Sequence, residues 1–350
     1  MIGIPDLEYH LSVWAADDPA RRDVATAIVR LAEAGRAMSE LVGQGALAGI
    51  LGASTGRCGV LEQQRSLDLV ANSLFLDAAR LAAVAGFLSE KLALPVEISA
   101  GASLLIAVDP LDGASDLDAG ISVGSTFSIM PAARTASSRD DLAQAFMQPG
   151  SQQLAAGIML YGAFTALAMT VGEGTHLFTL DRRSGRFVLT AANVCIPADA
   201  TEFAIDAATA RHWPPATRTY IDDCQRGRDG PRSKDFSMRW TGSMVAEIFR
   251  VLTRGGIVLC PGDSRVNQQS GVLRLLYQGN PLAFLIEQAG GVAVSGGTPC
   301  RDVVPVDVHQ CAPFAAGSRD EVARVVRLHL NPDATGERSQ LFGHRGLFWT

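Results

Sequence analysis

Residues 103–108 read SLLIAV, a continuous apolar run with turn residues around it. Because polar and apolar positions do not alternate, the pattern predicts a strand buried on both faces, inside a sheet that helices cover on both sides. Two stretches with apolar residues at helical spacing, 21–47 and 62–84, precede it. They predict amphipathic helices that pack on such a sheet, so the predicted fold class is α/β.

The rest of the chain changes character near residue 195. Residues 121–189 contain several short strand-like segments separated by glycines and one charged turn, which predicts neighbouring strands of one sheet. Beyond residue 195, predicted strands alternate with helices at 208–226, 244–254, 281–289 and 319–330. At roughly 100 to 200 residues per domain, the length allows two closely packed domains. We predict domains at 1–194 and 195–335 and a tail at 336–350.

Composition narrows the class of partner. Thirty basic and 36 acidic residues give a formal net charge of −6, which disfavours nucleic acid and favours a small molecule. The six cysteines include no CxxC pair, as expected of reduced thiols in the cytoplasm, and no secretory signal pattern opens the chain. Residues 154–172 carry no charge, so their length and composition could suit a membrane span. Gly162 divides them into two short apolar runs, which favours two buried strands around a turn.

The strongest functional signal is the pair Asp109 and Asp112, directly after the buried strand. Pro110 interrupts strand pairing and Gly113 permits a tight turn, so both carboxylates are expected at the carboxyl edge of a sheet. Hard cations such as Mg²⁺ prefer oxygen ligands, and the small residues that follow would offer backbone N–H groups to a phosphate. The alternative is an ordinary Asp-Pro turn whose second Asp is solvated.

The segment 103–129, SLLIAVDPLDGASDLDAGISVGSTFSI, resembles the signature of class I fructose-1,6-bisphosphatases. The resemblance continues through 234–259, 273–291 and 304–318, and covers roughly residues 20–350. It implies a layered α-β-α-β-α sugar-phosphatase fold with two mixed sheets, usually as a homotetramer, with metal bound by the first domain and sugar phosphate by the second. It also implies Mg²⁺-dependent hydrolysis of fructose 1,6-bisphosphate to fructose 6-phosphate, in gluconeogenesis or the Calvin cycle, with two or three Mg²⁺ or Mn²⁺ ions per subunit.

Carried over position by position, the resemblance assigns a role to each of several residues. The implied metal ligands are Glu90, Asp109, the Leu111 carbonyl, Asp112 and Gln278, and the implied catalytic acids that orient or deprotonate the attacking water are Asp68 and Glu90. The implied contacts to the 1-phosphate are Asp112, Gly113, Ala114, Ser115 and Arg274. The implied 6-phosphate contacts are Asp206, Arg239 and Trp240, the arginine commonly reaching in from a neighbouring subunit.

Two acidic positions of the family's metal site differ in this chain. The usual Ser-Glu-Glu is Ser89-Glu90-Lys91, and the usual acid after LRLLY is Gln278. An ammonium about 4 Å from a cation costs ~4 kcal/mol at an effective dielectric near 20. That is enough to expel one metal ion unless Lys91 turns away, whereas Gln278 could still coordinate through its amide oxygen.

The implied 6-phosphate pocket also differs. Asp206, Cys260 and Val272 stand where the family usually has Asn, Tyr and Lys, and losing a cation while gaining an acid disfavours a phosphate. Asp206 could instead be a helix N-cap with no ligand role. The alternatives to the main hypothesis are therefore a catalytically impaired paralogue that serves as a binding or regulatory subunit, and a sedoheptulose-1,7-bisphosphatase.

Overall fold

The structure, a computed structural model, describes residues 4–48, 57–132, 139–265 and 271–331, with the backbone alone at 57–66 and 139–140. The α-helices of these ranges are α1 Leu7–Ala15, α2 Pro19–Gln44, α3 Arg57–Arg80, α4 Arg139–Ala145, α5 Pro215–Gln225, α6 Met244–Arg254, α7 Asn280–Gln288 and α8 Arg319–Leu330.

The first sheet is formed by residues of the N-terminal half. Its strands are β1 Val84–Ser89, β2 Val96–Glu97, β3 Leu104–Asp112, β4 Val123–Pro131, β5 Ala155–Tyr161, β6 Thr165–Thr170, β7 Thr175–Asp181 and β8 Arg186–Ala191, in the order β2-β1-β3-β4-β5-β6-β7-β8. β1 and β3 run parallel and the other neighbours are antiparallel. This sheet is mixed, as predicted.

The second sheet belongs to the C-terminal half and is mixed as well. Its strands are β9 Glu202–Ala204, β10 Ser237–Met238, β11 Ile257–Cys260, β13 Val292–Ser295, β14 Thr298–Pro299 and β16 Phe314–Gly317, in the order β10-β9-β11-β16-β13-β14. β9 is parallel to both of its neighbours, whereas β16 is antiparallel to β11 and β13. A small third sheet joins β12 Leu273–Arg274 to β15 Cys311–Ala312, and it was not predicted.

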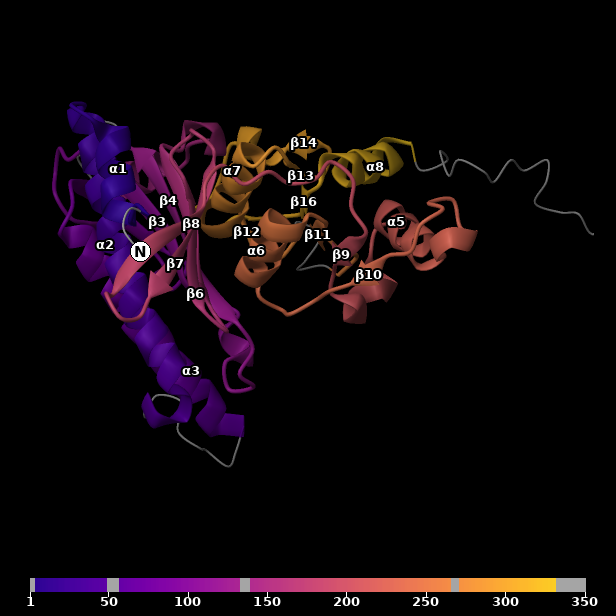
Figure 1. Cartoon of the computed structure of the whole chain (residues 1–350), viewed down its shortest axis with the longest axis horizontal. Helices are drawn as coiled ribbons and strands as arrows, with labels where there is room; N and C mark the ends of the chain where they lie inside the picture. Colours follow the sequence, from indigo (N-terminus) through magenta and orange to yellow (C-terminus); the bar gives the residue numbers. More distant parts are fainter. Residues whose placement is uncertain (1–3, 49–56, 133–138, 266–270, 332–350) are drawn as a thin grey trace, which may run out of the picture.

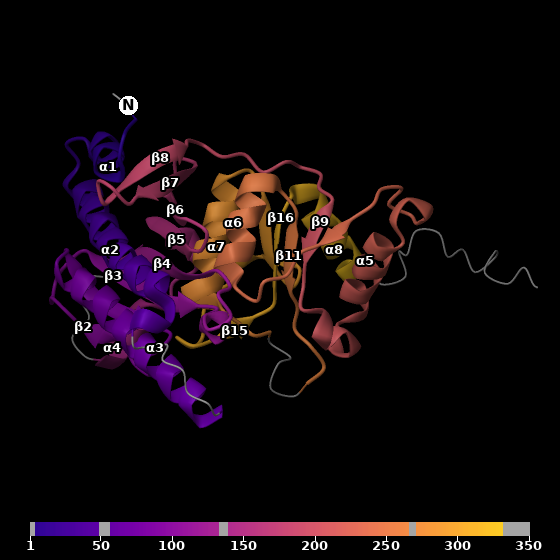
Figure 2. The same cartoon turned by 60° about the horizontal axis from the view of Figure 1, so that its bottom comes forward.

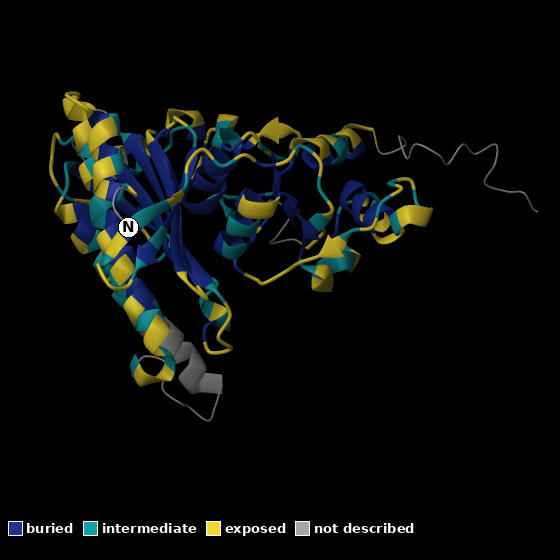
Figure 3. Cartoon of the chain, in the orientation of Figure 1, coloured by how far each residue is buried: buried dark blue, intermediate teal, exposed yellow. Residues whose placement is uncertain are grey.

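Helices and sheets alternate in five layers (Figures 1 and 2). α2 and α3 cover the outer face of the first sheet, α6 and α7 lie between the two sheets, and α8 with α5 covers the far face of the second. The central strands β3, β4, β5 and β6 are almost entirely buried (Figure 3), whereas the edge strands β2, β8, β10 and β14 are mostly exposed or half-buried. The predicted layered α-β-α-β-α fold is therefore confirmed.

One core joins the two halves of the chain. Leu285 and Ile286 of α7 pack in a single apolar cluster with Ile158 of β5 and Ala316 of β16, so α7 contributes to both sheets at once. The predicted domain boundary near residue 195 lies in the segment between β8 and β9. It stays a prediction, and the cluster around α7 packs residues of both halves together.

Several predicted elements need correction. The helix predicted at 62–84 ends at Arg80, and the following residues form β1, which the sequence analysis missed. The helix predicted at 208–226 is a 3₁₀ turn, Ala207–His212, followed by α5. Trp213 and Pro214 separate them, and α5 begins at Pro215, since a proline cannot donate a helical hydrogen bond and is tolerated only in the first turn. Residues 154–172 form β5 and β6 as predicted.

None of the helices within the described ranges is both long enough and apolar enough to cross a membrane. The predicted tail at 336–350 lies outside the described residues.

Candidate active site

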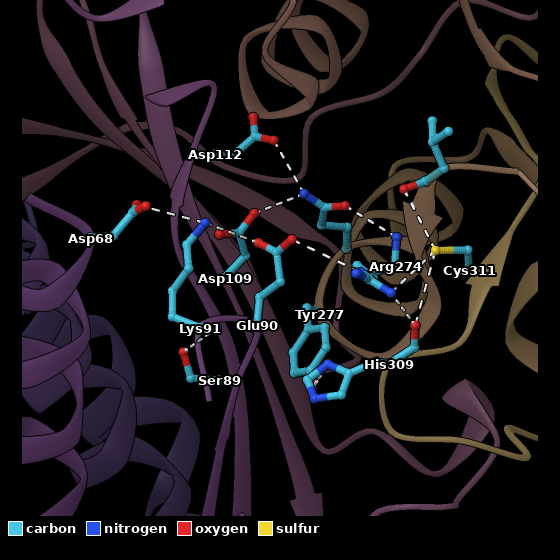
Figure 4. A network of polar contacts seen from close by, with 12 residues as sticks. Asp68, Ser89, Glu90, Lys91, Asp109, Asp112, Arg274, Tyr277, His309 and Cys311 are labelled. Carbon is cyan, nitrogen blue, oxygen red and sulfur yellow. Dashed lines mark hydrogen bonds and ion pairs between the residues drawn. The ribbon is translucent and has the colours of Figure 1, made fainter. Parts of the chain in front are cut away.

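The site begins where two parallel strands end side by side. Ser89 of β1 pairs with Val108 of β3, and the Glu90 N–H donates to the Val108 carbonyl at 3.0 Å. Because parallel strands end at the same edge of a sheet, Glu90 and Asp109 reach the same place. Figure 4 shows their side chains pointing toward each other.

Asp109 and Asp112 flank a distortion in β3. The pairing of β3 with β4 shifts register between these two residues, and the Asp109 carboxylate accepts a hydrogen bond from the Leu111 N–H at 3.2 Å. The Pro110 carbonyl accepts from the Ser125 hydroxyl at 2.7 Å, which fixes the turn. Asp109 is 1% exposed and Asp112 7%. The alternative of a solvated second Asp is therefore wrong.

Asp112 is held by the start of α6. One of its oxygens accepts from the Ser243 hydroxyl at 2.7 Å and from the Val245 N–H at 3.0 Å. The same Ser243 hydroxyl accepts from the Ala246 N–H at 3.3 Å, so Ser243 caps the helix. Sequence analysis did not select Ser243. Its place before an apolar helix is an N-cap signal, but its pairing with an acid 131 residues away carries no local signal.

Gly113 is required at the turn after Asp112. Its φ of +79° lies in the left-handed region, and a Cβ there would lie 2.9 Å from the Ser243 Cβ. Ala114 and Ser115 follow in a short 3₁₀ turn, Ala114–Asp116. The three residues predicted to hold a phosphate thus come directly after the buried acids, at the same end of β3.

Lys91 extends into the group of acids. Its Nζ lies 3.6 Å from Asp68 Oδ1 and 3.4 Å from Glu90 Oε2 (Figure 4). Asp68 belongs to α3, which packs against β3. Burial lowers the pKa of Lys91, but Asp109, Glu90 and Asp68 together outweigh burial and raise it, so the ammonium is charged. We call Asp68, Glu90, Asp109 and Asp112 the acid cluster.

Gln278 closes the acid cluster from the second half of the chain. It lies in a single π turn, Leu275–Gly279, a distortion that is frequent at functional sites. Its amide nitrogen donates to Asp109 at 2.7 Å and to Asp112 at 3.2 Å, and its amide oxygen accepts from the Arg274 N–H at 3.2 Å. The predicted metal contact through the amide oxygen would therefore require the amide to turn around.

Arg274 borders the cluster beside Glu90. Its Nε lies 4.0 Å from Glu90 Oε1, and its guanidinium donates to the His309 carbonyl and to the Cys311 sulfur. The Tyr277 hydroxyl and the His309 Nδ1 are 3.1 Å apart behind it. This support for Arg274 was not predicted: Tyr277 and His309 lie in segments that carry the family resemblance, but no role was assigned to either residue.

Burial and mutual repulsion dominate the electrostatics. Burial, together with the charges of Glu90 and Asp112, raises the pKa of Asp109 well above its ordinary value. Burial also raises the pKa of Asp112, although the hydrogen bonds from Val245 and Ser243 oppose it. Burial raises the pKa of Asp68, opposed by Lys91. Such acids are stabilised in their charged form by a nearby cation.

The donor set suits a divalent cation. Across the ranges that the structure describes, no three His, Cys, Asp or Glu side chains converge as a ready-made metal cage. Mg²⁺ in phosphate-transferring sites, however, is commonly held by one or two carboxylates, with water and substrate phosphate completing the shell. Asp109 and Asp112 with the Leu111 carbonyl match that chemistry, whereas the space between Asp68 and Glu90 already contains the Lys91 ammonium.

The residues predicted for the 6-phosphate have other partners here. The Asp206 carboxylate accepts from the Ala208 N–H at 3.0 Å and caps the turn that follows, which matches the N-cap alternative. Arg239 is exposed, 3.6 Å from a Glu202 oxygen, and its neighbour Trp240 is exposed as well. None of the hydrogen bonds or ion pairs of these described residues joins them to the acid cluster.

The five layers and the buried acids at the strand ends define a layered α/β protein with a carboxylate site. Sequence models of the fructose-1,6-bisphosphatase N-terminal and C-terminal domains match residues 14–192 and 196–330. The chain belongs to the fructose-1,6-bisphosphatase family.

Relatives and solved structures agree with this assignment. A class 1 fructose-1,6-bisphosphatase of Sinorhizobium medicae is 46% identical over 97% of both chains, and one of Nitrobacter hamburgensis is 47% identical over 98% of both. The fructose-1,6-bisphosphatase of Leishmania major in its holo form superposes with a TM-score of 0.85 at 29% identity, covering 93% of this chain and 99% of the other.

Proposed function

We propose that this protein hydrolyses fructose 1,6-bisphosphate to fructose 6-phosphate and phosphate with the help of Mg²⁺. The observation that carries the proposal is the pair of buried carboxylates, Asp109 and Asp112, held at the end of β3 with Glu90 and Arg274 beside them. Relatives that bear this enzyme's name over nearly their whole length support the substrate.

Asp109, Asp112 and the Leu111 carbonyl would hold the cation, with Glu90 close by. When bound, Mg²⁺ or Mn²⁺ lowers the pKa of water and neutralises charge on the leaving oxygen. The chain itself places the acids before a cation arrives, because Ser243, Val245 and Gln278 fix their carboxylates with hydrogen bonds. Such fixed charges are the main source of catalysis in phosphoryl transfer.

Two side chains are suited to handling the proton of the attacking water. Burial brings the pKa of Asp68 above its ordinary value, which makes it a better proton acceptor near neutral pH. Glu90 lies across from it, bound to the same Lys91 ammonium. We assign Asp68 and Glu90 to orienting and deprotonating this water.

The remaining predicted residues would bind the substrate. Gly113, Ala114 and Ser115 would offer N–H groups to the 1-phosphate, and the Arg274 guanidinium would neutralise it. For the 6-phosphate we propose Asp206, Arg239 and Trp240. Asp206 would then contact the ligand while it caps the turn, and Arg239 would contact the ligand while it is paired with Glu202. The exposure of Arg239 is compatible with its serving a neighbouring subunit of the homotetramer we expect.

Phosphate release tests the function directly. We expect turnover of fructose 1,6-bisphosphate with Mg²⁺ or Mn²⁺, and a loss of about 100-fold or more in Asp112→Ala. Asp77→Ala removes an exposed acid of α3 that pairs with Arg80 and serves as the control with unchanged rate. A parallel assay with sedoheptulose 1,7-bisphosphate shows which of the two sugar bisphosphates the protein prefers. Wild-type turnover no higher than that of Asp112→Ala would rule out the hydrolase.

One observation favours the second candidate, a catalytically impaired paralogue. Lys91 is bound to both acids that we assign to the water. If this impairs catalysis, Lys91→Glu combined with Gln278→Glu should raise a weak wild-type rate, whereas an unchanged rate would show that both residues are tolerated. A cytoplasmic location and a role in gluconeogenesis or the Calvin cycle also belong to this proposal.

A further inference from the structure

Lys91 is one of only two lysines among the 30 basic residues of the chain. The other, Lys234, lies in the C-terminal half and pairs with Asp199 and Glu321. Lys91 instead lies two residues after the end of β1, and its backbone N–H donates to the Ser89 hydroxyl at 3.2 Å. Its side chain is 24% exposed, so most of it is enclosed by the site.

The Lys91 ammonium divides the acid cluster into two halves. It forms ion pairs with Asp68 at 3.6 Å and Glu90 at 3.4 Å. Asp109 and Asp112, in contrast, form no ion pair with a lysine or arginine of the described ranges, and the group between them is the neutral Gln278 amide. One half is in direct contact with a cation. The other holds two buried carboxylates, of which Asp109 interacts electrostatically with Lys91 without forming an ion pair with it.

The charge of the site gives the number of cations still missing. The four carboxylates of the acid cluster face two cationic side chains, Lys91 and Arg274. With all four carboxylates ionised and no substrate bound, two negative charges remain, which a single divalent cation neutralises. A second divalent cation would add excess positive charge and would have to lie beside the ammonium, where like charges repel in a poorly solvated site.

We propose that the Lys91 ammonium is the permanent second cation of this site, so that each chain takes one divalent cation, held at Asp109 and Asp112. This inference rests on the proposed function and deepens it. Lys91 is then a positioning residue, since its ion pairs fix the two acids that face the attacking water.

The number of bound ions tests the inference without reference to activity. Mn²⁺ is titrated into the full-length protein and followed by calorimetry and by the electron paramagnetic resonance of free Mn²⁺. We expect one Mn²⁺ per wild-type chain and two per Lys91→Glu chain. Lys91→Met, which keeps the side-chain length, should bind a second Mn²⁺ at least tenfold more tightly than the wild type does. Lys234→Met is the control and should bind one.

The scarcity of lysine permits a second measurement on the wild-type protein. Selective ¹³C labelling of lysine gives signals from Lys91 and Lys234, which Lys234→Arg assigns. The first equivalent of Mn²⁺ should broaden the Lys91 signal and spare the Lys234 signal. In a matching Mg²⁺ titration the Lys91 signal should stop shifting after one equivalent, because the ammonium stays in place.

The outcomes separate this inference from the proposed function. Two Mn²⁺ ions on a wild-type chain that turns over substrate would overturn the inference and leave the function intact. The same holds if Lys91→Glu binds one ion, or if a second equivalent of Mg²⁺ shifts the Lys91 signal. One bound ion without phosphate release would overturn the function and leave the inference standing.

Discussion

Single residues set both the charge and the shape of this site. Asp109 and Asp112 are carboxyl groups enclosed by protein, a costly arrangement that is kept where function needs it. Lys91 and Gln278 change the charge around them without disturbing the backbone that carries them. Predicting that the acids meet was possible from sequence, because they follow a buried strand. Predicting the direction of the Gln278 amide was not, because it depends on Arg274 on the other side.

Gly113 offers a test at the scale of one residue. Gly113→Ala should cost more than the ~1 to 2 kcal/mol of left-handed strain, because the new Cβ would also collide with Ser243. Gly101→Ala is the matched control, since Gly101 has the same φ of +79° and nothing within 4 Å of its Cβ. We expect Gly101→Ala to lower the free energy of unfolding only by the backbone strain, and to keep its activity. Equal losses in free energy of unfolding for both variants, measured with denaturant, would contradict the close packing at Gly113.

Among the elements, α6 contributes both to the site and to the core. Its first turn donates a hydrogen bond to Asp112, while its apolar face packs between the two sheets. The helix itself was predictable from its periodicity, and α8 was predicted with its observed bounds, Arg319–Leu330. β1 was missed because its six residues continue the apolar pattern of α3, and short apolar runs do not distinguish helix from strand. That error concealed the parallel pair that brings Glu90 beside Asp109.

Ser243→Ala tests the link between α6 and the site. Loss of the cap and of the hydrogen bond to Asp112 should lower the free energy of unfolding by about 2 kcal/mol. It should also lower the rate of phosphate release roughly tenfold. Asp18→Ala removes the cap of α2, far along the chain, and should cost about 1 kcal/mol with activity unchanged. Ser243→Thr keeps the hydroxyl and should restore activity; a Thr variant as slow as the Ala variant would argue against the hydrogen bond.

At the scale of the whole molecule, the two halves share the apolar cluster around α7. The layered arrangement with two mixed sheets could be predicted, but only through the resemblance to known proteins. Composition and periodicity indicate helices and strands, whereas the order of strands in a sheet depends on contacts between distant segments. The packing of α7 against strands of both sheets is an example of such contacts.

Leu285→Ala tests whether the halves unfold together. Leu285 is fully buried in the cluster that joins both sheets, and its truncation should cost about 2 to 5 kcal/mol. Calorimetry of both proteins should show a single transition, shifted to lower temperature in the variant. Two transitions, of which only one shifts, would show that the predicted domains at 1–194 and 195–335 are independent units.

The pairing of Asp112 with Ser243 also has a consequence for biosynthesis. A ribosome releases Asp109 and Asp112 long before it adds Ser243 and Gln278, and N-terminal segments begin to fold first. An unfinished chain that ends before residue 243 therefore carries its acids without the groups that fix them. Hydrolytic competence should arise late in translation, as one step, when the second half docks on the first.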